Sequence, residues 1–304
     1  MDIGYKVALV QKMQDYLLMH LHDEEFDFET LYTAVGYSRR HADRCFQALL
    51  GKTPREYYRL LRMSESAKQL LEKDDSILET ALSADFQSHE GYTKAFREAF
   101  GKLPSEYRKG KSFIPLFIAY PIQGYYDYIN KKERDPMENK TCLCMITPVQ
   151  RPARKLIFLR SKKATEYWTF CEELGCEWVG LFNSNPAKFD TAAILTLPPF
   201  LVKEGYSDIA AGIEVPLDYD GEIPENCEVA ELPACEMLYF RSQPFDTEEE
   251  FFELMDEVNK AITVFDYAAN GYKEAPHLAP SFNFGGEKET GVKKALAVEK
   301  NQIK

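Results

Sequence analysis

The chain has 304 residues, of which 45% are hydrophobic and 28% charged, and its formal net charge is −12. This length exceeds that of one typical small domain and predicts two, and the composition is that of a globular protein with a substantial core. No apolar run is long enough to span a membrane and the first residues lack the apolar core of a secretory signal, so we expect a cytoplasmic protein without a membrane partner.

Seven cysteines are spread along the whole chain. Cys142 and Cys144 stand two positions apart, and Cys171 and Cys176 stand five apart. Neither pair is accompanied by the second pair of ligands that a structural zinc site requires, and the histidines do not cluster with them. We therefore expect reduced cysteines, no bound metal and no cofactor.

The first 110 residues contain an internal repeat. Residues 38–58, SRRHADRCFQALLGKTPREYY, align without gaps with residues 88–108, SHEGYTKAFREAFGKLPSEYR. Seven positions are identical, where chance gives about one. Two copies are too few for a solenoid, so we predict two similar modules.

Each copy has the residues of a helix with defined ends. A serine stands at the N-cap position, apolar residues follow at helical spacing, and a glycine stands where a C-cap belongs; these end residues are Ser38, Gly51, Ser88 and Gly101. Residues 53–56, Thr-Pro-Arg-Glu, then read as a capping box that opens the next helix. In the second copy Leu103 replaces the threonine, so that cap is lost.

A further short helix precedes each serine, within residues 27–38 and 75–88, and ends in a brief turn. Helix, tight turn and helix therefore occur twice, which is the helix-turn-helix pattern, and residues 54–73 predict one long helix between the copies. One such motif alone is more typical of an ordinary helical hairpin. A tandem pair with basic residues at equivalent positions predicts DNA binding, and residues 38–62 carry seven basic and two acidic residues, a net charge of +5.

Residues 111–136 read as a connecting segment that is too apolar to be a free linker, so we expect it to pack against one of the domains. From residue 137 the pattern changes to short strands and two helices. The strands are expected within 140–149, 154–160, 191–197, 208–215, 227–232, 235–241, 280–285 and 292–300, and the helices over 163–174 and 246–270, with Gly271 after the second. This order predicts an α+β domain with a mostly antiparallel sheet.

Residues 5–110 resemble the DNA-binding domain of the AraC/XylS family of bacterial transcription regulators. The resemblance rests on many positions at fixed spacing, among them Leu31, Gly36, Ser38, Arg44, Phe46, Gly51, Pro54, Tyr57, Arg62, Ala67, Ile77, Ala81, Phe86, Ser88, Phe96, Gly101, Pro104 and Tyr107. The chain departs from the family at Asp85, where glycine is usual, and at Ala42, where leucine is usual. The resemblance implies two recognition helices in successive major grooves on one face of the DNA.

The same resemblance assigns groove-facing positions, which are Arg39, Arg40, Asp43 and Arg44 in the first helix and His89, Glu90, Thr93 and Lys94 in the second. Basic residues near the helix ends are the candidates for phosphate contacts: Lys52, Arg55, Lys102, Arg108 and Lys109. An alternative role for Asp43 and Glu90 is to orient neighbouring arginines.

Residues 137–300 resemble a GyrI-like (Rob-type) effector-binding domain, through AAGIEVP, IPENCEVAELPACEMLYFRSQP, the long helix and GYKEAPHLAPSFNFG. The resemblance implies an aromatic pocket between two pseudo-symmetric halves. Several family members place a glutamate where this chain has Asn283, so we expect a neutral or polar effector rather than a cation. The candidate effector-binding residues are Trp178, Phe182, Glu214, Tyr239 and Asn283.

The expected protein is thus multidomain. An all-α tandem helix-turn-helix DNA-binding domain (1–110) is followed by a connecting segment (111–136) and an α+β GyrI-like domain (137–304). We expect a ligand-responsive transcription regulator whose partners are double-stranded DNA, a small effector and, as the resemblance implies, RNA polymerase; activation and repression both stay open. The alternatives are a GyrI-like small-molecule hydrolase or a ligand-sequestering protein fused to a DNA-binding domain, but no catalytic constellation is visible and we expect no enzyme.

Overall fold

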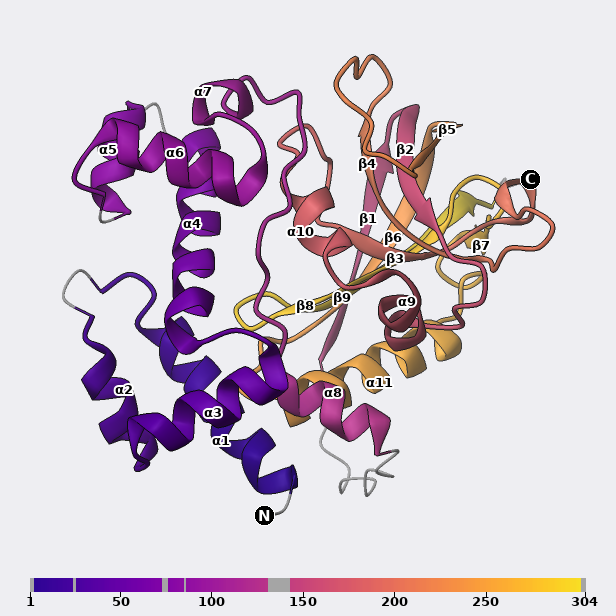
Figure 1. The fold of residues 1–304 in the computed structure, drawn as a ribbon. Helices are drawn as coiled ribbons and strands as arrows, with labels where there is room; N and C mark the ends of the chain where they lie inside the picture. Colours follow the sequence, from indigo (N-terminus) through magenta and orange to yellow (C-terminus); the bar gives the residue numbers. More distant parts are fainter. Residues whose placement is uncertain (1–2, 24–25, 73–75, 85, 131–142, 302–304) are drawn as a thin grey trace. The chain divides into compact units, whose positions relative to one another are not determined.

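The computed structural model describes residues 3–23, 26–72, 76–84, 86–130 and 143–301. The chain divides into two compact units, 1–134 and 135–304, of which the first is helical and the second is built on a sheet (Figure 1). The departure at Asp85 and the predicted boundary at 136/137 lie outside the described residues. No helix in the described part of the chain is long and apolar enough to cross a membrane.

The helical unit contains two helix-turn-helix motifs. Its helices are α1 (Ile3–Met19), α2 (Phe28–Val35), α3 (Arg39–Leu50), α4 (Pro54–Glu72), α5 (Ile77–Ser83), α6 (His89–Phe100), α7 (Pro104–Tyr107) and α8 (Ile122–Ile129). The first motif is α2–α3 and the second is α5–α6, and α4 runs between them (Figure 1). The predicted order of helix, turn and helix, repeated around one long helix, is confirmed.

Each motif has its own hydrophobic core, and α4 contributes to both. Tyr57 and Leu61, in the first half of α4, pack with α1, α2 and α3 around the buried Phe46. Ala67 and Leu70, in the second half, pack with α5 and α6 around Phe96. At 1.5 Å per residue the 19 residues of α4 form a rod about 28 Å long. The rod holds the two motifs at a fixed separation.

The connecting segment packs on the helical unit, as its apolar composition predicts. Ile114 and Leu116 are buried in the second core, whereas Phe117 and Ile122 pack against the first. The extended stretch therefore passes from one core to the other and then forms α8, which contacts α1. Over 113–122 the segment is part of the helical unit.

A buried glutamine fastens this segment. The side chain of Gln14 in α1 donates to the Tyr57 hydroxyl and to the Tyr120 carbonyl, both at 2.8 Å. Its own oxygen accepts from the backbone N–H of Ile122 at 3.0 Å. Gln14 is 1% exposed, so these bonds satisfy polar groups that water does not reach. One side chain thus joins α1, α4 and the connecting segment.

The helix ends follow the predicted caps with one exception. Gly51 and Gly101 adopt left-handed φ values of 68° and 72°, which favour glycine, and end α3 and α6. The Ser88 side chain accepts from the N–H of Gly91, but the Ser38 side chain makes no capping bond, so that prediction was wrong in its chemistry. Ser38 instead caps only through its extended backbone, with its carbonyl accepting from the N–H of Ala42 at 3.0 Å.

The capping box at the start of α4 is confirmed. Glu56 accepts from the N–H of Thr53 at 2.8 Å, and the Thr53 hydroxyl accepts from the N–H of Glu56 at 3.2 Å. The Thr53 N–H, and then the Thr53 hydroxyl, which donates to the same carboxylate at 2.9 Å, lower the pKa of Glu56. In the second copy Glu106 still accepts from the N–H of Leu103 at 2.9 Å, while the leucine side chain returns no bond. The second motif therefore keeps one of the two reciprocal hydrogen bonds of the capping box.

The second unit is a nine-stranded sheet with helices. Its strands are β1 (Cys144–Arg151), β2 (Arg154–Arg160), β3 (Ala193–Thr196), β4 (Ile209–Pro216), β5 (Glu228–Leu232), β6 (Cys235–Ser242), β7 (Tyr272–Glu274), β8 (Ser281–Glu287) and β9 (Gly291–Lys300). Its helices are α9 (Tyr167–Leu174), α10 (Trp178–Asn183), η1 (Pro199–Leu201) and α11 (Glu248–Val264). The strand order is β1-β6-β9-β8-β3-β4-β2-β5, with β7 beside β9, and the pairings are antiparallel.

This order reads alike from both edges. One half of the unit contains, in chain order, β2, α9, α10, β3 and β4. The other half repeats this order with β6, α11, β8 and β9, and the halves meet where β3 pairs with β8 at the middle of the sheet. The strand that precedes each half along the chain, β1 or β5, lies at an edge of the sheet. It pairs with the other half, β1 with β6 and β5 with β2. The unit consists of two similar halves that exchange their edge strands.

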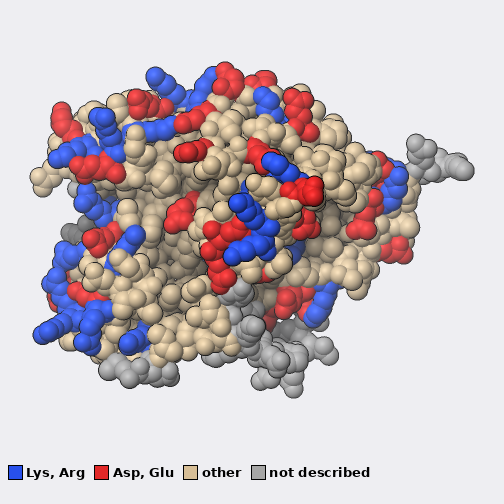
Figure 2. Space-filling model, turned by 45° about the vertical axis from the view of Figure 1, so that its right-hand side comes forward, with Lys and Arg blue, Asp and Glu red and all other residues tan. Residues whose placement is uncertain are grey.

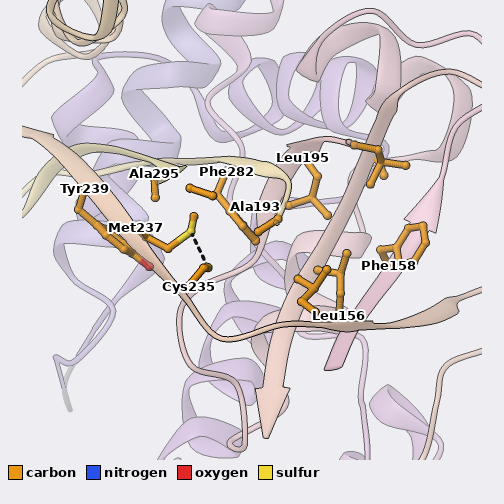
Figure 3. Packing of buried hydrophobic residues seen from close by; sticks show 14 residues of the cluster. Leu156, Phe158, Ala193, Leu195, Cys235, Met237, Tyr239, Phe282 and Ala295 are labelled. Carbon is orange, nitrogen blue, oxygen red and sulfur yellow. Dashed lines mark hydrogen bonds between the residues drawn. The ribbon is translucent and has the colours of Figure 1, made fainter. Parts of the chain in front are cut away.

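Alternate side chains of the strands serve two cores. Leu195, Tyr239 and Phe282 lie with other apolar residues on one face, drawn in Figure 3. The neighbouring side chains of β6 and β9, such as Phe240, lie on the opposite face and pack against α11. Successive side chains of a strand point to opposite faces of the sheet, so strands whose successive side chains are all apolar indicate a sheet that is covered on both faces.

Two helix predictions need correction. The short α10 was not predicted, because it follows α9 after only Gly175, Cys176 and Glu177. The helix expected over 246–270 ends at Val264, because Phe265 turns to an extended backbone (ψ 121°) and its ring packs on Phe240 with centroids 5.6 Å apart. Gly271, with φ 80°, belongs to the turn before β7.

We expect Gln14→Leu to lower the stability of the helical unit by about 2 kcal/mol, because it leaves buried polar partners on α4 and the connecting segment unsatisfied. Urea unfolding of the full chain, followed by the helical circular dichroism signal, measures the change. The exposed Gln47→Leu in α3 is the matched control. Equal stability of the two variants would contradict the role given to Gln14.

Candidate nucleic-acid interface and ligand cleft

The first predicted recognition helix, α3, exposes three arginines. Its buried side consists of Ala42, Cys45 and Phe46, and Arg39, Arg40 and Arg44 are exposed on the remaining surface. Among the described residues Arg40 has no hydrogen-bond or ion-pair partner, while Arg44 lies 3.3 Å from His41 Nδ1. The structure thus leaves the guanidinium of Arg40 available to an outside partner.

Asp43, on the same helix, is engaged within the protein. Its carboxylate accepts from the hydroxyl of Tyr32 at 2.7 Å and lies 3.7 Å from Arg39 Nε. Tyr32 is 5% exposed, and burial followed by this bond raises the pKa of its phenol. These contacts favour the orienting role for Asp43 over a base contact.

The second predicted recognition helix, α6, exposes His89, Glu90 and Lys94 opposite its buried side. Lys94 lies 3.9 Å from Glu98, and both side chains are exposed. A shallow hollow of about 640 Å³ brings all four predicted residues together, lined by His89, Glu90, Thr93, Lys94, Arg97, Glu98 and Leu103. Arg97 and Glu98 were not predicted, although each stands four positions after a predicted residue, Thr93 and Lys94 respectively, and that spacing could have found them.

Two of the phosphate candidates, Arg55 and Arg108, make contacts within the helical unit. The guanidinium of Arg55 lies over the ring of Phe28 at 4.6 Å, and Arg108 Nε donates to the Leu70 carbonyl at 3.3 Å. Lys52 and Lys102 follow the C-cap glycines of α3 and α6, and Lys109 is exposed after α7. Figure 2 shows Lys and Arg along the left-hand edge of the face it draws, with Asp and Glu among them.

The effector candidates do not form one group. Glu214 and Tyr239 lie on the face of the sheet that holds the Leu195 core, whereas Trp178 and Phe182 are buried in α10. Asn283 lies on the opposite face from Tyr239, since it alternates with Phe282 along β8. The sequence could not divide these residues because it does not reveal which face each strand turns to the helices.

Glu214 belongs to a buried charge network. It lies 2.5 Å from Arg154 Nε and 3.4 Å from Arg151 Nε, and Arg151 also donates to the Tyr239 hydroxyl. Burial raises the pKa of Glu214, and the two arginines act in the opposite direction. Lys293 pairs with Asp190 at 2.5 Å beside Arg151. Both predicted residues are therefore occupied by internal partners.

A cleft of about 310 Å³ lies over the middle of the sheet. Its floor comes from the central strands β3, β8 and β9 with β4, and its walls from the segment around Glu166 and Tyr167 and from α11. Asn283 lines it, together with two polar residues that were not predicted, Asn259 and Lys294. Lys294 Nζ donates to Asn259 Oδ1 at 2.5 Å, and burial lowers the pKa of this lysine. The strand pattern of 292–300 could have placed Lys294 on the face of Leu296.

Comparison with known proteins identifies the helical unit. Residues 31–110 match the family model described as a helix-turn-helix domain. The probable transcription factor PqrA of Proteus vulgaris is 38% identical over 87 residues, which are 29% of this chain and 71% of PqrA. The uncharacterized HTH-type transcriptional regulator YbfP of Bacillus subtilis is 31% identical over 123 residues, 40% of each chain.

The transcriptional regulator Rob of Salmonella typhimurium is 28% identical over 118 residues, which are 39% of this chain and 40% of Rob. The matched part of the chain thus spans less than half the length of YbfP and of Rob. The similarity covers a DNA-binding module rather than a whole protein.

We expect Asp43→Ala to destabilise the first motif by about 1 kcal/mol, because the Tyr32 hydroxyl loses its acceptor. Urea unfolding of the full chain measures it. Glu98→Ala, which removes an exposed carboxylate from α6, is the control and should change stability by less than about 0.5 kcal/mol. A D43A variant as stable as E98A would return Asp43 to the base-contact candidates.

Proposed function

We propose, since the chain belongs to the AraC-type helix-turn-helix transcription regulators, that it is a ligand-responsive member. In this proposal α3 and α6 read base edges in successive major grooves, and the second unit is a GyrI-like domain that binds a small effector. The observation that carries the proposal is the pair of exposed helices held by one rod, α4, whose two halves are fixed in separate cores.

For the DNA side, we assign base contacts first to Arg40, Arg44, Glu90 and Lys94. Arginine and lysine donate to guanine, and glutamate accepts from cytosine. Arg39, His89 and Thr93 are neighbouring candidates, and Asp43 positions Arg39. Lys52, Lys102 and Lys109 are proposed to contact phosphate, with Arg55 and Arg108 contributing charge from their packed positions.

For the effector side, the two-halved strand order supports the GyrI-like assignment, because its halves meet at β3 and β8. The cleft over these strands is the proposed effector site, with Asn283 in its floor. Its volume is at the lower end of the range of about 300–1,000 Å³ that is usual for small-molecule sites. An effector regulates DNA binding only if it prefers one of two states of the chain. RNA polymerase stays a proposed partner.

We expect Arg40→Ala and Lys94→Ala each to weaken specific DNA binding about 10-fold, because each removes one base contact. The measurement is fluorescence anisotropy of the full chain on a duplex that the wild type selects from a random pool. Lys260→Ala, an exposed lysine of the second unit, is the control. Wild-type affinity in both variants would contradict the assignment of α3 and α6.

The two motifs should contribute unequally to the salt dependence. Residues 38–62 carry a net charge of +5, and residues 86–110 carry five basic and three acidic residues, a net charge of +2. We therefore expect the slope of log affinity against log salt to fall more in Arg40→Ala than in Lys94→Ala. An equal or larger loss in Lys94→Ala would refute this asymmetry.

The cleft is tested by filling it. We expect Ser281→Trp, at the end of the cleft floor, to abolish the binding of ligands that a thermal-shift screen of the full wild-type chain identifies, because the indole occupies the space. The variant's melting temperature without ligand shows whether it folds. Undiminished binding by a folded variant would place the effector elsewhere.

A further inference from the structure

We infer that the cleft takes an anionic effector, a carboxylate on an apolar body, with Lys294 and Asn283 as the groups that hold the carboxylate. The inference rests on the proposal that this cleft is the effector site.

The two residues are direct neighbours across the sheet. Asn283 of β8 and Lys294 of β9 are register partners, and both line the cleft. Side chains of such a pair have Cβ atoms about 5 Å apart on the same face. The Asn283 oxygen accepts from the N–H of Gly285 at 3.1 Å, and its Nδ2 has no partner among the described residues. A lysine and an asparagine therefore rise from neighbouring positions of the cleft floor, and both side chains can donate hydrogen bonds.

Lys294 lacks a carboxylate partner within the described part of the chain. Its Nζ contacts a neutral amide oxygen, that of Asn259, and no ion pair of Lys294 is formed there. A half-buried ammonium without an ion-pair partner loses hydration that one neutral amide oxygen restores only in part. Burial accordingly lowers its pKa, while the more distant Asp256 acts in the opposite direction. A bound anion would supply the missing charge.

The adjacent lysine shows the ordinary arrangement. Lys293, one residue earlier and on the opposite face, pairs with Asp190 at 2.5 Å. Lys260 on α11, which is exposed, also has a carboxylate, that of Glu257 at 2.5 Å. Of these three lysines, the one without a carboxylate within ion-pair distance is the one that lines the cleft.

The other charge in the cleft lining is already compensated. Glu166 caps α9, and its two oxygens accept from the N–H groups of Trp168 and Thr169 at 2.8 and 2.9 Å. The positive end of the helix offsets this carboxylate. A cation entering the cleft would meet Lys294 and an occupied carboxylate, whereas an anion meets two donors.

The rest of the cleft fits an apolar body. Its lining includes the apolar residues Tyr167, Ile194, Ile209, Ile262 and Leu296. Apolar contact supplies affinity and the paired donors fix orientation, which is the usual division in small-molecule sites.

The test compares three probes with one body and different heads: 2-naphthoate, 2-naphthamide and 2-naphthylmethylammonium. Isothermal titration of each into the full chain measures affinity. We expect the carboxylate to bind at least about 10-fold more tightly than the amide and the ammonium to bind most weakly, as one charge-assisted hydrogen bond is worth about 1.5 kcal/mol or more.

Two variants assign the effect to the cleft. Lys294→Met keeps the length and apolar stem of the side chain and should remove the advantage of the carboxylate, whereas the control Lys260→Met should keep it. Asn283→Glu should reject naphthoate and favour the ammonium probe. A preference for the carboxylate that is retained in a folded Lys294→Met variant overturns the inference. If Lys294→Met is poorly folded, the Asn283→Glu variant decides, and the absence of a reversal in it overturns the inference.

The outcomes separate the two claims. If the amide binds as tightly as the carboxylate, and Ser281→Trp blocks both, the cleft is a ligand site but the anionic class is wrong. If the probes bind and a folded Ser281→Trp does not block them, the cleft assignment itself fails. Failure of naphthoate to bind at millimolar concentration also overturns the inference.

Discussion

The arrangement of the helical unit depends on the sharing of α4 between two cores. Residues of its first half are fixed by the α1–α3 core and residues of its second half by the α5–α6 core, so neither motif can rotate without breaking one of them. The connecting segment adds a second link, with Ser64 of α4 accepting from the N–H of Phe117 at 2.7 Å. Arg62 adds a third, donating to the Ser83 carbonyl at the end of α5 at 3.1 Å. The two helix-turn-helix motifs are thereby joined in one structural unit.

Much of this unit could be predicted because its signals are local. Glycine at positive φ, a threonine three residues before glutamate, and apolar residues at helical spacing determine helix ends and faces within a few residues of sequence. The misses come from contacts over longer separations. Asp43 has its partner Tyr32 eleven positions upstream, and Gln14 has partners more than forty and more than one hundred residues away.

In the sheet unit, too, some features could be predicted from the local sequence and others could not. Strand existence follows from alternation, but the face that each strand turns to the helices follows from pairings between distant segments. Tyr239 and Asn283 were predicted as partners in one pocket, yet register places them on opposite faces. Lys293 and Lys294 are alike in sequence, and one ion-pairs while the other lines the cleft, because consecutive residues of a strand point to opposite sides.

We propose that one chain places α3 and α6 in successive major grooves on one side of the DNA. Hydroxyl-radical and methylation footprinting of the full chain on its selected site tests this most directly. We expect two protected major-groove windows about 10 base pairs apart on one face of the duplex, the spacing of one helical turn. A single protected window, or two windows on opposite faces, would contradict it.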